Sequence, residues 1–93
     1  MHVAVVQLGF SIPHARSLKD KRQAIRSFRD RLAGGFNVSV AETGAQDKWQ
    51  RAVFAAAMVG GDRRYVEGAM RKIVDFAGTF GDLVLVDSRI DFL

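Results

Sequence analysis

The chain has 93 residues, of which 48% are hydrophobic and 26% charged, with a formal net charge of +4 and a sequence pI near 10.1. This size and composition predict one globular domain over residues 1–93. The absence of cysteine excludes a disulfide framework, thiolate zinc sites and cysteine nucleophiles, and it favours a cytoplasmic protein. The longest strongly apolar run, 52–61, is far shorter than the roughly 20 residues that span a bilayer.

The N-terminal segment predicts a strand followed by a turn. Residues 2–10 are β-rich and apolar on both faces, which indicates a central strand covered on both sides. They lack the Lys or Arg start of a signal peptide. The segment 11–16 contains the only proline, Pro13, and makes the turn into the next element.

Residues 16–32 predict a long amphipathic helix. Ser17 is a suitable N-cap, Asp20 supports a capping-box-like start, and the pair Gly34–Gly35 is expected to end the helix. An apolar seam follows helical spacing: Leu18, Ile25, Phe28 and Leu32. A second stripe beside the seam is basic: Lys19, Arg22, Arg26 and Arg29.

Positive charge is concentrated on this helix. The segment 16–31 carries seven basic residues against two acids, whereas the rest of the chain carries seven against eight. A surface of this kind suits a polyanion such as nucleic acid.

The rest of the chain predicts two strands, a helix and a last strand. Residues 36–43 alternate apolar and polar, which is typical of an edge strand. The alanines of 49–59 would suit a helix, but the flanking glycines and the short loop 44–48 favour a strand. Asp62 is an N-cap for a helix over 63–77.

The last strand is expected over 83–93. Its predicted core-facing side chains are Val84, Val86, Ile90 and Phe92. Its predicted outward side chains are Leu83, Leu85, Asp87, Arg89 and Asp91.

The resulting order, βαββαβ, predicts an α+β ferredoxin-like fold, a four-stranded antiparallel sheet with two helices on one face. The other face would then be apolar, with these outward residues: Val3, Val5, Gln7, Val53, Ala55, Ala57 and Val59, extended by Leu83 and Leu85. A monomer rarely exposes so much apolar surface, so we expect a homo-oligomer, most simply a dimer through this open sheet face. The alternative is a register slipped by one residue, which would exchange the two faces.

Catalytic patterns are sparse, and we expect no enzyme, no metal site and no cofactor. His2 and His14 have no partner in a metal-binding pattern, no G-x-S-x-G elbow occurs, and no glycine-rich phosphate loop occurs. One loop region could bind a ligand through a carboxylate pair beside an aromatic side chain: Glu42, Asp47, Trp49, Gln50 and Arg51. Turn chemistry and an ion pair explain these residues more simply, and a hydrolytic use of the two carboxylates is the least favoured hypothesis.

Nucleic-acid binding, if present, is expected through the basic helix. The sheet lacks the aromatic signature with which ferredoxin-like RNA-binding domains stack bases, and Trp49 is expected at the end of its strand. Phosphate contacts are predicted for six side chains: Arg16, Lys19, Lys21, Arg22, Arg26 and Arg29. Arg16 and Ser17 at the helix start could also hold an anion, although a capped helix beside a surface arginine explains them more simply.

The segments IPHARSLKDKR (12–22) and FNVSVAETGAQDKWQRA (36–52), with the C-terminal strand, resemble the YlxP-like family of small bacterial proteins of unknown function. The resemblance covers nearly the whole chain and implies the ferredoxin-like fold, a strand at 49–59 and no established catalytic residues. Family members are often encoded among translation and ribosome-maturation factors, which implies a role with RNA or a ribosomal particle by association. The first hypothesis is therefore an accessory protein that binds RNA through its basic helix. The alternative is a ligand-responsive or purely structural homo-oligomeric module.

Overall fold

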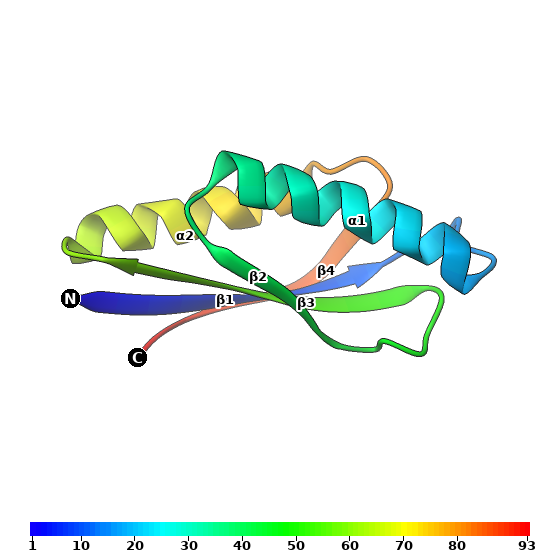
Figure 1. Cartoon of the computed structure of the whole chain (residues 1–93), viewed down its shortest axis with the longest axis horizontal. Coiled ribbons are helices and arrows are strands. Elements are labelled where there is room, and N and C mark those ends of the chain that lie inside the picture. The colour runs from blue at the N-terminus through cyan, green and yellow to red at the C-terminus, as the bar shows by residue number, and fades with distance from the viewer.

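A computed structural model describes all residues, 1–93, and places two helices on one side of a single sheet (Figure 1). The elements in chain order are β1 (His2–Ser11), α1 (Leu18–Gly35), β2 (Ser39–Gly44), β3 (Arg51–Gly60), α2 (Arg63–Gly78) and β4 (Val84–Phe92). All neighbouring strands are antiparallel, in the order β2-β3-β1-β4. The predicted ferredoxin-like βαββαβ fold is confirmed.

The helix-facing side chains of the central strands β1 and β3 form the sheet side of the core. Their alternate residues face the helices, so that Val6 lies opposite Ala56 and Leu8 opposite Phe54. The region after the hairpin loop is a strand rather than a helix, as predicted. It begins at Arg51 instead of Trp49, because residues 45–50 form the connection between β2 and β3.

Helix α1 begins as its sequence predicts and ends slightly later. The Ser17 hydroxyl accepts a hydrogen bond from the Asp20 amide at 3.1 Å, and the Asp20 carboxylate accepts one from the Arg16 amide at 3.0 Å. Gly34 and Gly35 form the last turn instead of ending the helix, and neither has a positive φ. The helix stops at Phe36, whose backbone is extended.

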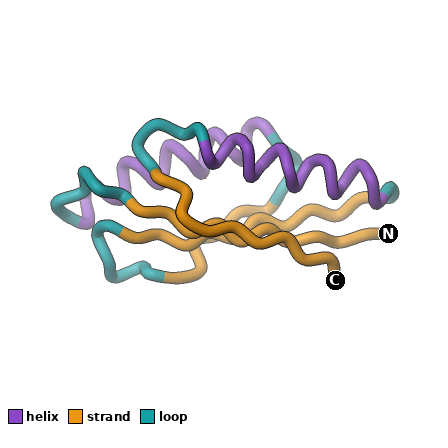
Figure 2. Tube along the Cα trace, turned by 180° about the vertical axis from the view of Figure 1, so that it is seen from behind, coloured by secondary structure: helices purple, strands orange, loops and turns teal.

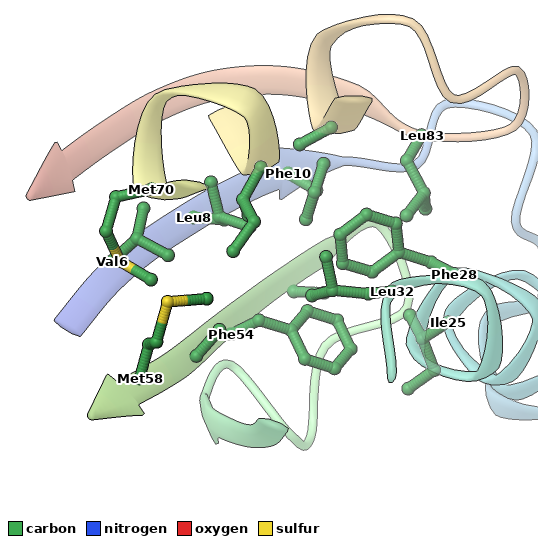
Figure 3. Packing of buried hydrophobic residues seen from close by; sticks show 14 of the residues in the cluster. Val6, Leu8, Phe10, Ile25, Phe28, Leu32, Phe54, Met58, Met70 and Leu83 are labelled. Atoms are coloured by element: carbon green, nitrogen blue, oxygen red, sulfur yellow. The ribbon is translucent and has the colours of Figure 1, made fainter. Parts of the chain in front are cut away.

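Phe28 lies at the centre of an aromatic cluster that joins α1 to the sheet and to the end of α2. Its ring centroid lies 4.9 Å from that of Phe10, 5.5 Å from Phe54, 5.8 Å from Phe76 and 5.4 Å from Phe80. Figure 3 shows Phe28 and its neighbours on α1 directed toward the side chains of the two central strands. Aromatic pairs at these separations add to the free energy gained by burying apolar area.

A β-bulge in β4 changes which residues of that strand face the core. Gly9 pairs with Asp87 but Phe10 pairs with Leu85, so that Val86 is an extra residue on β4. A Cβ on Gly9 would lie 3.3 Å from the Asp87 Cβ and 4.0 Å from a Val86 methyl group. Glycine at position 9 therefore gives the bulge its space.

Because of this bulge, the prediction of which side chains in 83–86 face the core is wrong. Leu83 is 3% exposed and Leu85 is packed against the core, whereas Val84 and Val86 are about half exposed, at 49% and 54%. Beyond the bulge Ile90 packs against the core as predicted.

The second face of the sheet is uncovered; it is largely apolar along β1 and β3, whereas the second half of β4 adds the outward charged side chains Asp87, Arg89 and Asp91. Figure 2, from behind, shows both helices on one side of the strands only. We call the following outward residues the open face: Val3, Val5, Ala41, Val53, Ala55, Ala57, Val59, Val84 and Val86. The last two replace the predicted Leu83 and Leu85. The other residues predicted to face outward, including the polar Gln7, lie on this side of the sheet, so the register is not slipped.

The packing at the end of β3 generates a prediction about two adjacent glycines. A Cβ on Gly60 would lie 2.6 Å from a methyl group of the fully buried, β-branched Val66, whereas a Cβ on Gly61 would meet nothing within 4 Å. We expect Gly60→Ala to lower the free energy of unfolding by about 1–3 kcal/mol through overpacking. Urea denaturation measures the loss, and Gly61→Ala is the matched control. Equal midpoints for the two variants would contradict this packing.

Candidate nucleic-acid interface

The orientation of α1 is set by a buried seam. The residues of α1 that are buried are Lys21, Ile25, Phe28 and Leu32. Leu18, the predicted first member of the seam, is 36% exposed at the start of the helix. At about 100° per residue the seam occupies a narrow sector of the helix, which fixes where every other side chain of α1 points.

The predicted basic row occupies one flank of α1. We call Lys19, Arg22, Arg26 and Arg29 the basic stripe. On a helical projection its centre lies about 110° from that of the buried seam. The opposite flank, with Asp20 and Ala24, faces Asp82 in the connection between α2 and β4. The basic stripe therefore points away from α2.

All four side chains of the basic stripe are exposed and none forms a salt bridge. The salt bridges in the structure join other residues: Lys21 to Glu42, Arg71 to Glu67 and Arg89 to Asp91. Lys19, Arg22 and Arg26 line a shallow hollow with Gln23, and no acidic residue lines it. Arg16, just before the helix, is also exposed and without a salt bridge. Five of the six predicted phosphate contacts are therefore accessible.

Lys21 is the exception. The sequence pattern predicts that it contacts phosphate at the surface, but its side chain is buried. Its side chain is 2% exposed, and its ammonium donates to the Ala45 carbonyl at 2.6 Å and lies 3.1 Å from a Glu42 carboxylate oxygen. A signal for this burial is present in the sequence, because position 21 fills the gap in the seam spacing between Leu18 and Ile25. The aliphatic stem occupies a seam position while the ammonium reaches the β2–β3 loop.

The β2–β3 loop is fixed to the start of α1 by several contacts. Ala45 has a positive φ of 58°, which is unfavourable for a residue with a Cβ. Its carbonyl accepts from Lys21 and also from the Lys48 amide at 3.1 Å. At the other end of the loop, the Gln50 side-chain amide donates to the carbonyls of Pro13 at 3.3 Å and Ala15 at 3.1 Å. These contacts place the loop beside the turn that precedes α1, at the end of the molecule away from both termini (Figure 1).

The predicted ligand-binding residues are only partly brought together. Asp47, Trp49, Gln50 and Arg51 line one shallow depression with Lys48, which the sequence pattern did not single out. Glu42 does not line this depression, because its carboxylate is directed to Lys21. The two carboxylates of the hydrolytic hypothesis therefore do not share a pocket.

No group of three or more His, Asp or Glu side chains comes together in a way that could hold a metal ion. Neither helix has the length and apolar character that crossing a lipid bilayer requires. Exposed positive charges lie at this end of the molecule, and such charges bind anions through hydrogen bonds and Coulomb attraction.

Comparisons with known proteins give the family and no activity. Residues 3–90 match the family described as "Protein of unknown function (DUF503)". The chain is also similar to the "Uncharacterized protein YlxP" of Bacillus subtilis (strain 168), with 33% identity over 78 residues, 84% of this chain and 85% of that protein. The chain therefore belongs to the DUF503 family, and the predicted YlxP-like relationship is confirmed.

The buried contact of Lys21 leads to a prediction about stability. We expect Lys21→Ala to lower the free energy of unfolding by about 1–3 kcal/mol, because it removes one of the two donors to the Ala45 carbonyl and the cation that faces Glu42. Chemical denaturation measures the change. Lys19→Ala removes the same side chain two residues earlier, where it is exposed, and should leave stability nearly unchanged. A decrease for Lys21→Ala no larger than that of the control would contradict a stabilising contact.

Proposed function

We propose that this DUF503 protein binds RNA, free or in a ribosomal particle, through phosphate contacts of the basic stripe, and that its role is binding rather than catalysis. The observation that carries the proposal is the row of four exposed basic side chains, none of them in a salt bridge, on the flank of α1 that faces away from α2.

Uncompensated charge of one sign is what distinguishes this row from an ordinary solvated helix face. On α2, by comparison, Arg71 is paired with Glu67 across one helical turn. Positive charges on one flank repel one another, and a bound polyanion relieves that repulsion while releasing its own counterions. The stripe runs over about 15 Å of helix, from Lys19 to Arg29, a length along which a nucleic acid presents several phosphates.

Charge reversal on the stripe tests the proposal. We expect the triple variant Lys19→Glu, Arg22→Glu and Arg26→Glu to weaken RNA binding by at least about tenfold at moderate salt, because each substitution replaces a phosphate contact with a repulsion. The slope of log K against log salt concentration should also become shallower by about one for each phosphate that the variant no longer binds. Fluorescence anisotropy of a labelled RNA over a salt series measures both quantities.

The matched control makes the same change of net charge on the other helix. The triple variant Arg64→Glu, Arg71→Glu and Lys72→Glu alters exposed residues of α2. It should retain most of the affinity if the stripe is the contact surface. Equal decreases in affinity for the two triple variants would mean that only net charge matters, and a flat salt series for the unaltered protein would remove the phosphate-contact proposal altogether.

We propose further that a second copy of the chain covers the open face. Its residues are small or β-branched and lie on a sheet surface that neither helix covers, which suits close face-to-face packing of two identical sheets. One margin of this surface, on the edge strand β4, carries charged side chains: Asp87, Arg89 and Asp91. Val59, Val84 and Val86 are exposed at 59%, 49% and 54% in the single chain. The basic stripes lie on the helical layer, so both would stay accessible in such a dimer.

A charge in the middle of the open face tests this arrangement. Ala55 lies between Gln7 of β1 and Ala41 of β2. We expect Ala55→Glu to raise the dimer dissociation constant by at least about a hundredfold, because each copy would bury a carboxylate without a partner in the interface. Sedimentation velocity at micromolar concentration measures the change. Ser27→Glu, on the exposed side of α1, is the control and should stay dimeric. A monomeric unaltered protein would contradict the proposal.

A further inference from the structure

We infer that the β2–β3 loop is a base-stacking platform, on which Trp49 receives an unpaired base of the RNA whose phosphates lie along the basic stripe. The inference rests on the proposed function and narrows it to RNA with a single-stranded segment. It assigns a binding role to a residue outside the helix.

Trp49 is placed for contact with a ligand rather than for packing. It is the only tryptophan of the chain and it is 51% exposed. It lies in the loop before β3 and does not belong to the buried core cluster. An exposed indole offers a large flat π surface, and stacking on such a surface is the general way in which proteins hold unpaired bases.

The surroundings of Trp49 carry charge suited to a nucleotide. Lys48 and Arg51 line the same shallow depression, and both are exposed and without a salt bridge. Asp47 lines it too and opposes phosphate binding there. A base stacked on the indole with its phosphate near Lys48 or Arg51 is consistent with this mixed lining, whereas a purely phosphate-binding site would not tolerate the carboxylate well.

Hydrogen bonds to neighbouring segments hold both ends of the loop. Trp49 is followed by Gln50, whose side chain is bonded to the carbonyls of Pro13 and Ala15, and whose own carbonyl accepts from the Ile12 amide at 2.9 Å. At the other end, the buried Lys21 ammonium bonds the left-handed Ala45. A platform fixed in this way loses little conformational entropy when a base binds.

The same bonds attach the loop to the start of α1, the end of the helix at which the stripe begins. Gln50 is bonded next to Arg16, and Lys21 belongs to the first turns of α1 between Lys19 and Arg22. A single strand can therefore contact the stripe through its phosphates and place one base on Trp49. A fully paired duplex offers the same phosphates but no free base.

The only tryptophan also reports directly on this contact. We expect a uridine 12-mer to quench the fluorescence of the unaltered protein, and a fully paired RNA duplex of equal length to bind with little quenching. Anisotropy of end-labelled RNA measures affinity independently. Trp49→Ala should weaken single-strand binding by about fivefold to a hundredfold and leave duplex binding unchanged, whereas Trp49→Phe should retain most of the affinity.

Two further variants test whether the effect is specific to Trp49 and its charged surroundings. Tyr65 is 71% exposed on α2, and Tyr65→Ala should have no effect on either RNA. Asp47→Asn removes the opposing carboxylate and should strengthen single-strand binding. Circular dichroism confirms that each variant is folded.

Failure of the inference is distinguishable from failure of the proposed function. If the labelled single strand binds but Trp49 fluorescence does not change, or if Trp49→Ala weakens single strand and duplex equally, the stacking platform is overturned and phosphate binding by the stripe stands. If neither RNA binds, the proposed function fails and the platform fails with it.

Discussion

The surface of this protein follows from the way α1 rests on the sheet. Ile25, Phe28 and Leu32 enter the core from one narrow sector of the helix, and Phe28 is enclosed by aromatic rings from both central strands and from the region around the end of α2. Rotating α1 about its axis would expose these rings, at a cost far above the few tenths of a kcal/mol that an exposed charge contributes. The apolar seam therefore fixes the basic stripe on the outer flank, where none of its side chains forms a salt bridge.

Lys21 extends this constraint from the helix to the neighbouring loop. A lysine at a seam position would be costly if its ammonium had no partner, but here the side chain is long enough to reach a backbone carbonyl and a carboxylate. The bond helps to hold Ala45 in a left-handed conformation that is unfavourable for a residue with a Cβ. One buried cation thus joins the two regions that carry the exposed positive charge and the exposed indole. The open sheet face lies on the side of the sheet away from both helices, so the proposed self-association would leave the basic stripe uncovered.

Most of the fold could be predicted from periodicity and capping residues. The features that could not be predicted depend on contacts between distant segments. Ser17, Asp20 and the alternation of β1 indicate their elements locally. The bulge at Val86 could not be predicted from β4 alone, because it depends on the space that Gly9 leaves on β1. The burial of Lys21 is indicated by seam spacing, but its partner at Ala45 is 24 residues away, and only the folded chain brings them together. For the same reason Glu42 and Trp49, close in sequence, end in different environments.

The proposals for this protein share one requirement, that RNA contacts it on the outer flank of α1 and at the adjoining loop. Ultraviolet crosslinking of RNA to the unaltered protein, followed by mass spectrometry of the nucleotide-bearing peptides, locates those contacts without any substitution. We predict crosslinks within 16–31 and at 47–51, with few on α2 or on the open sheet face. Crosslinks concentrated on α2 or on the open face, or none at all at low salt, would contradict this placement of the RNA.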